Sequence, residues 1–389
     1  MTVSTIPKIF LRWDQIEGLI SKPTYQNSNV MIYAPEWVKE GLRIISSHIP
    51  PGIGFDIYDG KGSSKVGSLT IEGQISLQQL VMISRNEPEN VTGIINFKNY
   101  EPNIVDKSVI YALKDLVRQC VIVGKDKTTH YGGYPRGSPI PQKDKVYIAD
   151  LAGLQFQRSY NSGRLVLIDK NTPSGLLDEL IYRSVVGENK RSFDEAAADA
   201  SGRYVKLFSQ NQYFDSTAYK KFVSNDLLLA GLALNDISEN EEINFKFLKY
   251  GTGFFAGSSE MQVILDQYII EGVREGIQIL FASHNPKWIK SIELPFYDFD
   301  DQILAICKNH NVECKFSRDD ALKKTHPQLV TATTNCADPH VVMGNEMGYS
   351  SVDAAISQNL ESRGHIFSPC VNKLMGAQFI PLKPEICRL

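Results

Sequence analysis

The fold is decided between residues 243 and 283, in four consecutive runs: INFKFLKY (243–250), GTGFFAG (251–257), SSEMQVILDQYIIEG (258–272) and IQILFAS (277–283). The first and last runs are short and apolar, which predicts strands. The third run predicts a helix, because its apolar residues recur at helical spacing: Met261, Ile264, Leu265, Tyr268 and Ile269. A strand, glycine-rich loop, helix and strand in this order predict an α/β fold with a parallel sheet.

The same alternation continues toward the C-terminus. A helix is predicted near 300–309, followed by strands VECKF (312–316) and LVTATTN (329–335). The last strand leads directly into TTNCADPHVVMGNEMGYSSVDAAISQNL (333–360), the most informative segment of the chain.

The chain before residue 243 gives weaker signals. VTGIINF (91–97) predicts a strand, a helix is expected over 109–120, and the Gly- and Pro-rich 130–145 stretch predicts a long loop. LQFQRSY and RLVLIDK predict a hairpin turning at 161–163. From 172 the pattern is helical, with Ser192 and Glu195 spaced as a capping box. We therefore expect three parts: an N-terminal α/β portion (1–171), a helical insertion (172–240) and a ligand-binding core (241–389).

Composition excludes several classes of protein. Of the 389 residues, 42% are hydrophobic and 22% charged, as in ordinary globular proteins. The 41 Lys and Arg against 44 Asp and Glu give a net charge of -3, which predicts neither a nucleic-acid nor a membrane partner. No secretory signal and no apolar run near the ~18 residues of a membrane span is evident. Six cysteines without a CxxC pair predict reduced thiols and a cytoplasmic protein.

The glycine-rich loop is the first candidate site. Its candidate ligand-binding residues are Gly251, Thr252, Gly253, Phe254, Phe255 and Gly257. Glycines let main-chain N–H groups approach a ligand closely, and the N-terminus of the following helix favours phosphate. A tight turn that binds nothing is an equally good interpretation of the loop taken alone.

A dinucleotide-binding Rossmann turn is one alternative, because Gly251 and Gly253 stand as GxG. That fold places an acidic residue after the next strand, where it holds the ribose hydroxyls. The predicted strand 277–283 is followed by His284 and Asn285, with no carboxylate. The pattern therefore disfavours an NAD(P)-dependent oxidoreductase, which stays an alternative.

The second candidate site is the 333–360 segment, whose residues of interest are Thr334, Asn335, Asp338, His340, Asn345, Glu346 and Asp353. The carboxyl ends of parallel strands meet at one edge, so these residues and the glycine loop are expected on the same side of the sheet. Each has a structural alternative. Asp353 can complete a capping box begun by Ser350, Asp338 can serve a turn, and His340 can be a packed loop histidine.

Together the two segments resemble the macrodomain family. The run TTNCADPH...GNEMGYSSVDAAI is similar to the macrodomain strand, loop and VDxAI helix, and GTGFFAG is similar to the loop that cradles the diphosphate of ADP-ribose. Here the VDxAI segment comes last, as in a circularly permuted or rearranged member, and Gly344 to Ser351 replaces the usual triple glycine. Among macrodomains the chain most resembles the MavL-like effector ADP-ribosylhydrolases of intracellular bacterial pathogens, distant relatives of poly(ADP-ribose) glycohydrolase.

The resemblance covers about 245–360 and implies a three-layer α/β/α macrodomain with a mixed sheet, completed by residues 1–171. It implies an ADP-ribosylhydrolase without a metal or cofactor, acting in the cytoplasm or, for an injected effector, in the host cytosol. ADP-ribosylated ubiquitin is one implied substrate. By this resemblance, the main-chain amides of 252–257 hold the diphosphate of ADP-ribose, and Asn335 binds the hydroxyls of its distal ribose. Phe281 or His284 is a candidate for the adenine pocket.

Cleavage of the ribosyl bond passes through an oxocarbenium-like state that carboxylates stabilise. The acidic candidates are Asp353, Asp338 and Glu346, in that order of preference. The same residues could also form a module that binds ADP-ribose without cleaving it, and this function remains an alternative.

Overall fold

The computed structural model describes part of the chain: residues 30–35, 37–47, 53–58, 65–71, 95–96, 116, 119, 121–124, 146–151, 153–156, 162–171, 175–208, 211–319, 324–335 and 378–382. The predicted loop 130–145 lies outside these residues, as does most of the predicted helix 109–120.

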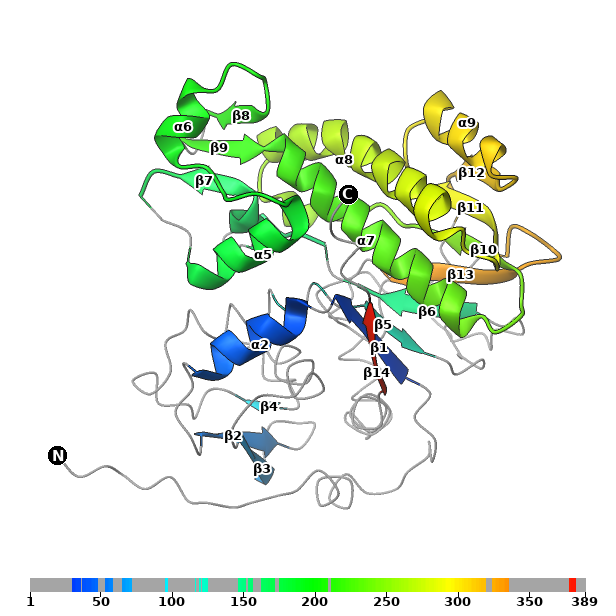
Figure 1. Ribbon diagram of the computed structural model, residues 1–389, viewed down its shortest axis with the longest axis horizontal. Coiled ribbons are helices and arrows are strands. Elements are labelled where there is room, and N and C mark those ends of the chain that lie inside the picture. Colours follow the sequence, from blue (N-terminus) through cyan, green and yellow to red (C-terminus); the bar gives the residue numbers. More distant parts are fainter. Residues whose placement is uncertain are drawn as a thin grey trace.

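The main sheet has eight strands among the described residues (Figure 1). Their spatial order is β12 (Glu313–Ser317), β11 (Ile289–Pro295), β10 (Ile243–Lys246), β13 (Val330–Asn335), β6 (Val146–Asp150), β5 (Val121–Gly124), β1 (Val30–Pro35) and β14 (Gln378–Leu382). The run from β12 to β6 is parallel. β5 is antiparallel to both neighbours, and β14 is parallel to β1. The predicted α/β class is confirmed, with a mixed sheet.

Two long helices, α7 (Ser216–Ile237) and α8 (Ser259–Ile279), pack side by side over the sheet (Figure 1). They approach closely at Gly272, where an added Cβ would lie 2.8 Å from the main-chain oxygen of Lys220. The smaller α9 (Asp301–Asn309) packs against α8 and β12. On β10, Ile243 and Phe245 alternate with Asn244 and Lys246, and all four are buried. The apolar pair faces α7, since Phe245 lies beside Gly231 of that helix.

A second, antiparallel sheet has the order β7 (Leu167–Asp169), β9 (Gln212–Asp215) and β8 (Tyr204–Leu207). Helices α5 (Leu176–Val186) and α6 (Phe193–Ala198) lie in the same region, and the predicted capping box of Ser192 and Glu195 is confirmed at α6. Residues 172–240 thus include two strands as well as helices, and the division into three parts stays a prediction. The described N-terminal elements also include α2 (Trp37–Ser47) and a sheet of β3 (Lys65–Ile71), β2 (Ile53–Tyr58) and β4 (Ile95–Asn96).

Two predicted elements are wrong. Residues 277–283 form no strand, because α8 continues to Ile279 and ends in a π-helical turn, η4 (Leu280–His284). The buried residues Val273, Ile277, Leu280 and Phe281 continue the helical stripe of α8, and a short apolar run cannot be told from a buried helix by periodicity alone. The predicted hairpin is also wrong where the structure describes it: 154–156 form no strand, 162–165 form a 3₁₀ turn, η2 (Ser162–Leu165), and β7 pairs with β9. Residues 157–161 of this prediction lie outside the described residues.

The predicted strands 243–250, 312–316 and 329–335 and the helix near 300–309 are confirmed as β10, β12, β13 and α9, with β10 shorter than expected. Of the predicted strand 91–97, the structure describes only β4. No helix in the described ranges is both long enough and apolar enough to cross a membrane.

Candidate functional site

The parallel strands bring the two predicted segments to one edge of the sheet. Lys246 at the end of β10 is in register with Thr333 of β13, and Asn335 at the end of β13 is in register with Asp150 of β6. From β10 the chain continues to β11 and β12 on one side, whereas β13 and β6 lie on the other. The edge between β10 and β13 is therefore a topological switch point, the place where open α/β sheets bind ligands.

The glycine-rich loop after β10 is seated on the segment 154–156. Gly251 and Gly257 both have φ of 73°, a left-handed conformation that favours glycine. An added Cβ at Gly251 would lie 3.2 Å from the Leu154 oxygen. The Phe156 N–H donates to the Phe255 oxygen at 2.8 Å, and the Ala256 N–H donates to the Gly253 oxygen at 3.0 Å. These contacts fix the path of the loop.

Several main-chain donors of the loop stay open. Among the described residues, no hydrogen bond engages the N–H groups of Thr252, Gly253 or Gly257. Gly253 and Gly257 are exposed and Thr252 is half-buried. Helix α8 begins two residues after Gly257, with the Ser258 side chain accepting from Met261 N–H at 3.1 Å. Open N–H groups at the positive end of a long helix can bind a phosphate or diphosphate group.

The base of the loop is anchored in the core. Tyr250 is buried, its hydroxyl donates to Asp226 Oδ2 of α7 at 2.6 Å, and burial raises its pKa well above the ordinary value. Lys249 pairs with Asp266 of α8 at 2.6 Å. Phe255 is half-buried, and the side chain of Phe254 lies outside the described atoms. The residues that precede the loop are therefore held in place by α7 and α8.

Thr334 lies at the end of β13, as the strand prediction requires, but it is completely buried. Its Oγ1 accepts from the Leu248 N–H at 2.9 Å, so the side chain ties β13 to the chain that leads into the loop. Of Asn335, the structure describes the main chain only. The other predicted residues lie outside the described residues: Asp338, Asn345, Glu346 and Asp353.

Sequence reasoning missed a buried charged network beside this edge. Lys246 and Glu293 are both inside the protein, 3.5 Å apart. Glu293 also accepts from Ser317 Oγ at 2.6 Å, from Asn244 Nδ2 at 3.1 Å and from the Thr325 hydroxyl. Burial alone would raise the pKa of Glu293, but these hydrogen bonds and Lys246 outweigh it and lower the pKa. The alternation in INFK was the available signal, because it gives the strand a polar face.

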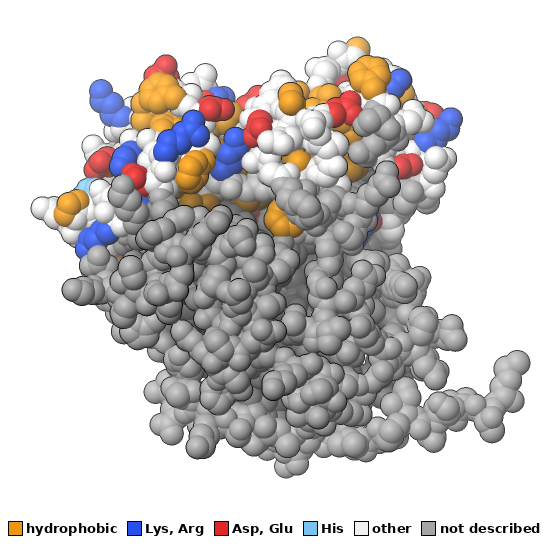
Figure 2. All heavy atoms as spheres, turned by 180° about the vertical axis from the view of Figure 1, so that it is seen from behind, with side chains coloured by type: hydrophobic (Ala, Val, Ile, Leu, Met, Phe, Trp, Pro, Cys, Tyr) orange, Lys and Arg blue, Asp and Glu red, His pale blue; other side chains and the backbone are white. Residues whose placement is uncertain are grey.

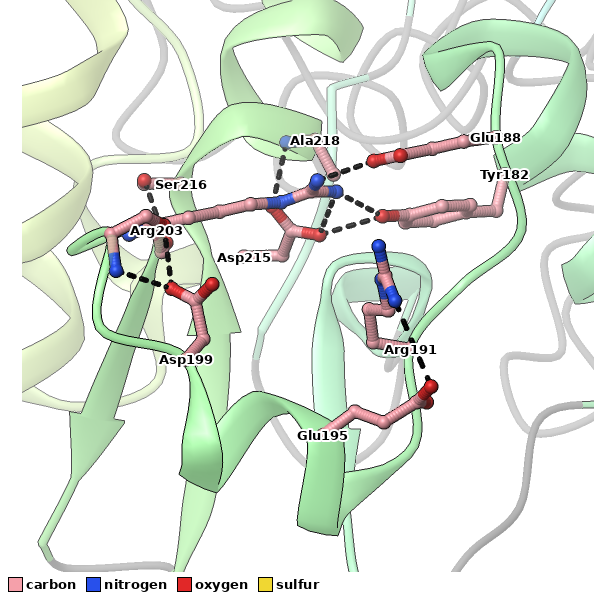
Figure 3. Close-up of polar contacts among 10 residues, drawn as sticks. Tyr182, Glu188, Arg191, Glu195, Asp199, Arg203, Asp215, Ser216 and Ala218 are labelled. Atoms are coloured by element: carbon pink, nitrogen blue, oxygen red, sulfur yellow. Dashed lines mark hydrogen bonds and ion pairs between the residues drawn. The ribbon is translucent and has the colours of Figure 1, made fainter.

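A second charged cluster joins α5, the small sheet and the N-terminus of α7 (Figure 3). Asp215 caps α7 by accepting from the Ala218 N–H at 2.9 Å, and Arg203 donates to both of its oxygens at 2.8 and 2.9 Å. Tyr182 donates to Asp215 at 2.6 Å, and Glu188 accepts from Arg203. Asp215 is completely buried and its carboxylate is used within the protein, so the cluster serves the fold.

The expected adenine pocket at Phe281 or His284 is wrong. Both residues lie in η4, after the far end of α8, and 21 helical residues span about 32 Å. They therefore lie at the opposite edge of the sheet from loop 251–257. Phe281 is buried and its ring stacks on His310 with centroids 5.9 Å apart.

An acidic residue does follow the strand after the glycine-rich loop, contrary to the prediction. The strand that follows the glycine loop is β11, and Asp298 and Asp300 come soon after its end at Pro295. Asp300 caps α9 and pairs with Arg274, whereas Asp298 is exposed. An acidic side chain thus follows the next strand after all.

Charges of both signs intermingle over the described part of the face in Figure 2. Within the described ranges, no three His, Cys, Asp or Glu side chains converge as metal ligands would.

No protein-family model matches this chain, and no curated protein matches it.

Proposed function

We propose that this protein binds ADP-ribose at the carboxyl edge of the parallel sheet and hydrolyses the bond between the distal ribose and a modified protein. One observation carries the proposal: the N–H groups of Thr252, Gly253 and Gly257, before the start of α8, have no hydrogen-bond partner among the residues that the structure describes. They lie beside the strand that leads into the acidic segment 336–353. The proposed fold is a macrodomain-like, three-layer α/β/α arrangement. The mixed sheet with its parallel run supports it.

In this proposal the loop holds the diphosphate through its main-chain donors, and Asn335 binds the ribose hydroxyls. Asp353, Asp338 and Glu346 stabilise the oxocarbenium-like state, with Asp353 orienting the attacking water. The chemistry uses no cofactor. ADP-ribosylated ubiquitin is the first substrate to test, and the proposed place of action is the cytoplasm, or the host cytosol for an injected effector.

The test is release of ADP-ribose from a modified protein by wild-type protein and by Asp353→Asn. The variant should turn over at least about tenfold more slowly, a loss of about 1.4 kcal/mol of transition-state stabilisation, while ADP-ribose binding is retained. Asp301→Asn, at an exposed residue in the first turn of α9, is the matched control and should react like wild type. Equal turnover in all three proteins would contradict the role of Asp353. Binding without any release would favour a non-catalytic ADP-ribose-binding module.

An NAD(P)-dependent oxidoreductase is the second candidate, and two observations favour it. The strand order β12-β11-β10-β13 with a glycine loop after β10 is the order of half of a dinucleotide-binding fold, and Asp298 follows β11. This alternative requires tighter binding of NAD or NADP than of ADP-ribose. It also requires reduction of the dinucleotide in the presence of a substrate, which absorbance spectroscopy would detect.

A further inference from the structure

Strand β8 lies at the edge of the small sheet and, among the described strands, pairs with β9 alone. The Ser216 N–H donates to the Arg203 oxygen at 3.0 Å, and these two residues continue the register of β8 and β9. Main-chain groups of an antiparallel strand turn alternately toward and away from the neighbouring strand, so those of Val205 face β9. The N–H and C=O groups of Tyr204 and Lys206 therefore form an outer edge, and no hydrogen bond within the described ranges engages them.

This outer edge ends beside the N-terminus of α8. Phe208, the residue after β8, donates its N–H to Glu260 Oε1 at 3.0 Å. Glu260 is in the first turn of α8 and follows Gly257 by three residues, which span at most about 10 Å of extended chain. A chain segment that lies along the outer edge of β8 therefore ends near the glycine-rich loop.

Two exposed apolar side chains adjoin this end of β8. Phe208 is 81% exposed, and Val263, one helical turn after Glu260 on α8, is 68% exposed. Exposed apolar side chains that gather at one place indicate a contact surface, and an unpaired strand edge is a template for another extended chain. The Lys206 ammonium lies 5.7 Å from the centre of the Phe208 ring, and no carboxylate pairs with it in the part of the chain that the structure describes.

We infer that the outer edge of β8 binds an extended segment of the modified protein as an added strand, while the ADP-ribose of that protein lies on loop 251–257. Main-chain hydrogen bonds to Tyr204 and Lys206 hold the segment, and Phe208 and Val263 contact its apolar side chains. The charge of Lys206 favours an acidic residue opposite it. The inference rests on the proposed function, because it assigns a surface for the protein part of the proposed substrate.

A second copy of this chain is the other partner that an edge strand commonly meets. Two β8 strands paired edge to edge would bring two Lys206 side chains onto one short ladder, where like charges are destabilising. A segment of the modified protein is therefore the occupant that fits the charge of this edge.

Cleavage kinetics of ADP-ribosylated ubiquitin and of the ADP-ribosylated amino acid alone test the inference in Lys206→Pro. Proline removes the N–H at the outer edge and leaves the hydrogen bonds to β9 in place. The KM for modified ubiquitin should rise about tenfold at unchanged kcat, because the added strand loses a hydrogen bond and its fit to the edge. The KM for the amino acid should not change. Lys206→Ala keeps the N–H and is the matched control, with a rise in KM below about threefold.

Two further variants separate docking from folding. Val205→Pro removes an N–H that donates to β9 and should lower the melting temperature, whereas Lys206→Pro should not. Phe208→Ala changes no residue of β8 and should raise the KM for modified ubiquitin about fivefold by removing an apolar contact.

The outcomes separate this inference from the proposed function. If Lys206→Pro and Phe208→Ala cleave modified ubiquitin with the KM of wild type, the docking surface is wrong and the proposed function stands. Cleavage of the modified amino acid alone by wild-type protein also overturns the docking surface and leaves hydrolysis standing. A wild-type dimer that Lys206→Pro converts to a monomer in sedimentation would assign the edge to a second copy instead. If wild-type protein cleaves neither substrate, both proposals are overturned.

Discussion

Lys246 and the loop 251–257 are separated only by residues 247–250, yet their polar groups are arranged in opposite ways. Lys246 is inside the protein beside Glu293, whose carboxylate accepts hydrogen bonds from three further side chains. The loop leaves the N–H groups of Thr252, Gly253 and Gly257 without a partner among the described residues. We call the network of Lys246 and Glu293 closed, because its charged groups are paired inside the protein, and we call the loop open, because these N–H groups have no partner among the described residues.

The difference shows how a polar group at a strand end should be judged. Buried polar groups that find their partners inside the protein stabilise one arrangement of the chain. Main-chain donors that find none must bind water or a ligand. The absence of a hydrogen-bond partner within the described part of the chain, and not the presence of a charge, is what distinguishes the candidate site from the network beside it.

Replacing the cation of the closed network should have the largest effect on stability. Lys246→Met leaves Glu293 buried without its counter-charge, and breaking a buried pair in this way costs about 3–5 kcal/mol of unfolding free energy. Urea denaturation measures it. Lys290→Met is the matched control on the neighbouring strand, because the Lys290 side chain is exposed and lies 3.9 Å from Glu242. It should change stability by less than about 1 kcal/mol. Equal effects would show that the network is not closed.

A smaller effect is expected at the anchor of the open region. Tyr250→Phe removes the hydroxyl that donates to Asp226, and a hydrogen bond to a charged group contributes about 1.5–3 kcal/mol. Tyr268→Phe, at a half-buried ring on α8, should be close to neutral. Thermal unfolding of both variants compares them, and an unchanged melting temperature for Tyr250→Phe would show that the loop is not held by this bond.

The lowered pKa of Glu293 predicts how the closed network responds to acid. A carboxyl group whose pKa is lower in the folded state stabilises the fold above its unfolded pKa, and this contribution is lost as pH falls through the folded pKa. Stability should therefore begin to fall as the pH drops below the ordinary glutamate pKa of 4.5, and should continue to fall until the pH has passed the lower pKa of folded Glu293. The stability of the Glu293→Gln variant should fall less steeply over this range of pH. Parallel slopes for the two proteins would contradict the assignment.

Much of the C-terminal fold was predictable from local signals. The strand before the glycines, α9, β12 and β13 each have apolar residues at the right period and clear ends. The error at 277–283 arose because a short apolar run fits a buried helix as well as a strand. Of the small sheet, β7 lies inside the predicted strand RLVLIDK, whereas β8 and β9 were missed because each has four residues, too few to show an alternation.

The open part of the site was predictable and the closed part was not. Glycines at 251, 253 and 257 mark an unusual backbone path in the sequence itself. By contrast, the pairing of Lys246 with Glu293 depends on which strands become neighbours.

The most direct test of the central claim is calorimetric titration of ADP-ribose, NAD and NADP into wild-type protein and Gly253→Val. A Cβ at Gly253 meets no atom of the described residues within 4 Å, so the fold should accept the side chain while the ligand should not. We expect wild-type protein to prefer ADP-ribose, and Gly253→Val to bind it at least about tenfold more weakly at an unchanged melting temperature. Gly175→Val, before α5, should bind as wild type does. No binding of ADP-ribose, or equal binding by Gly253→Val, would contradict the claim that the open loop is the ligand site.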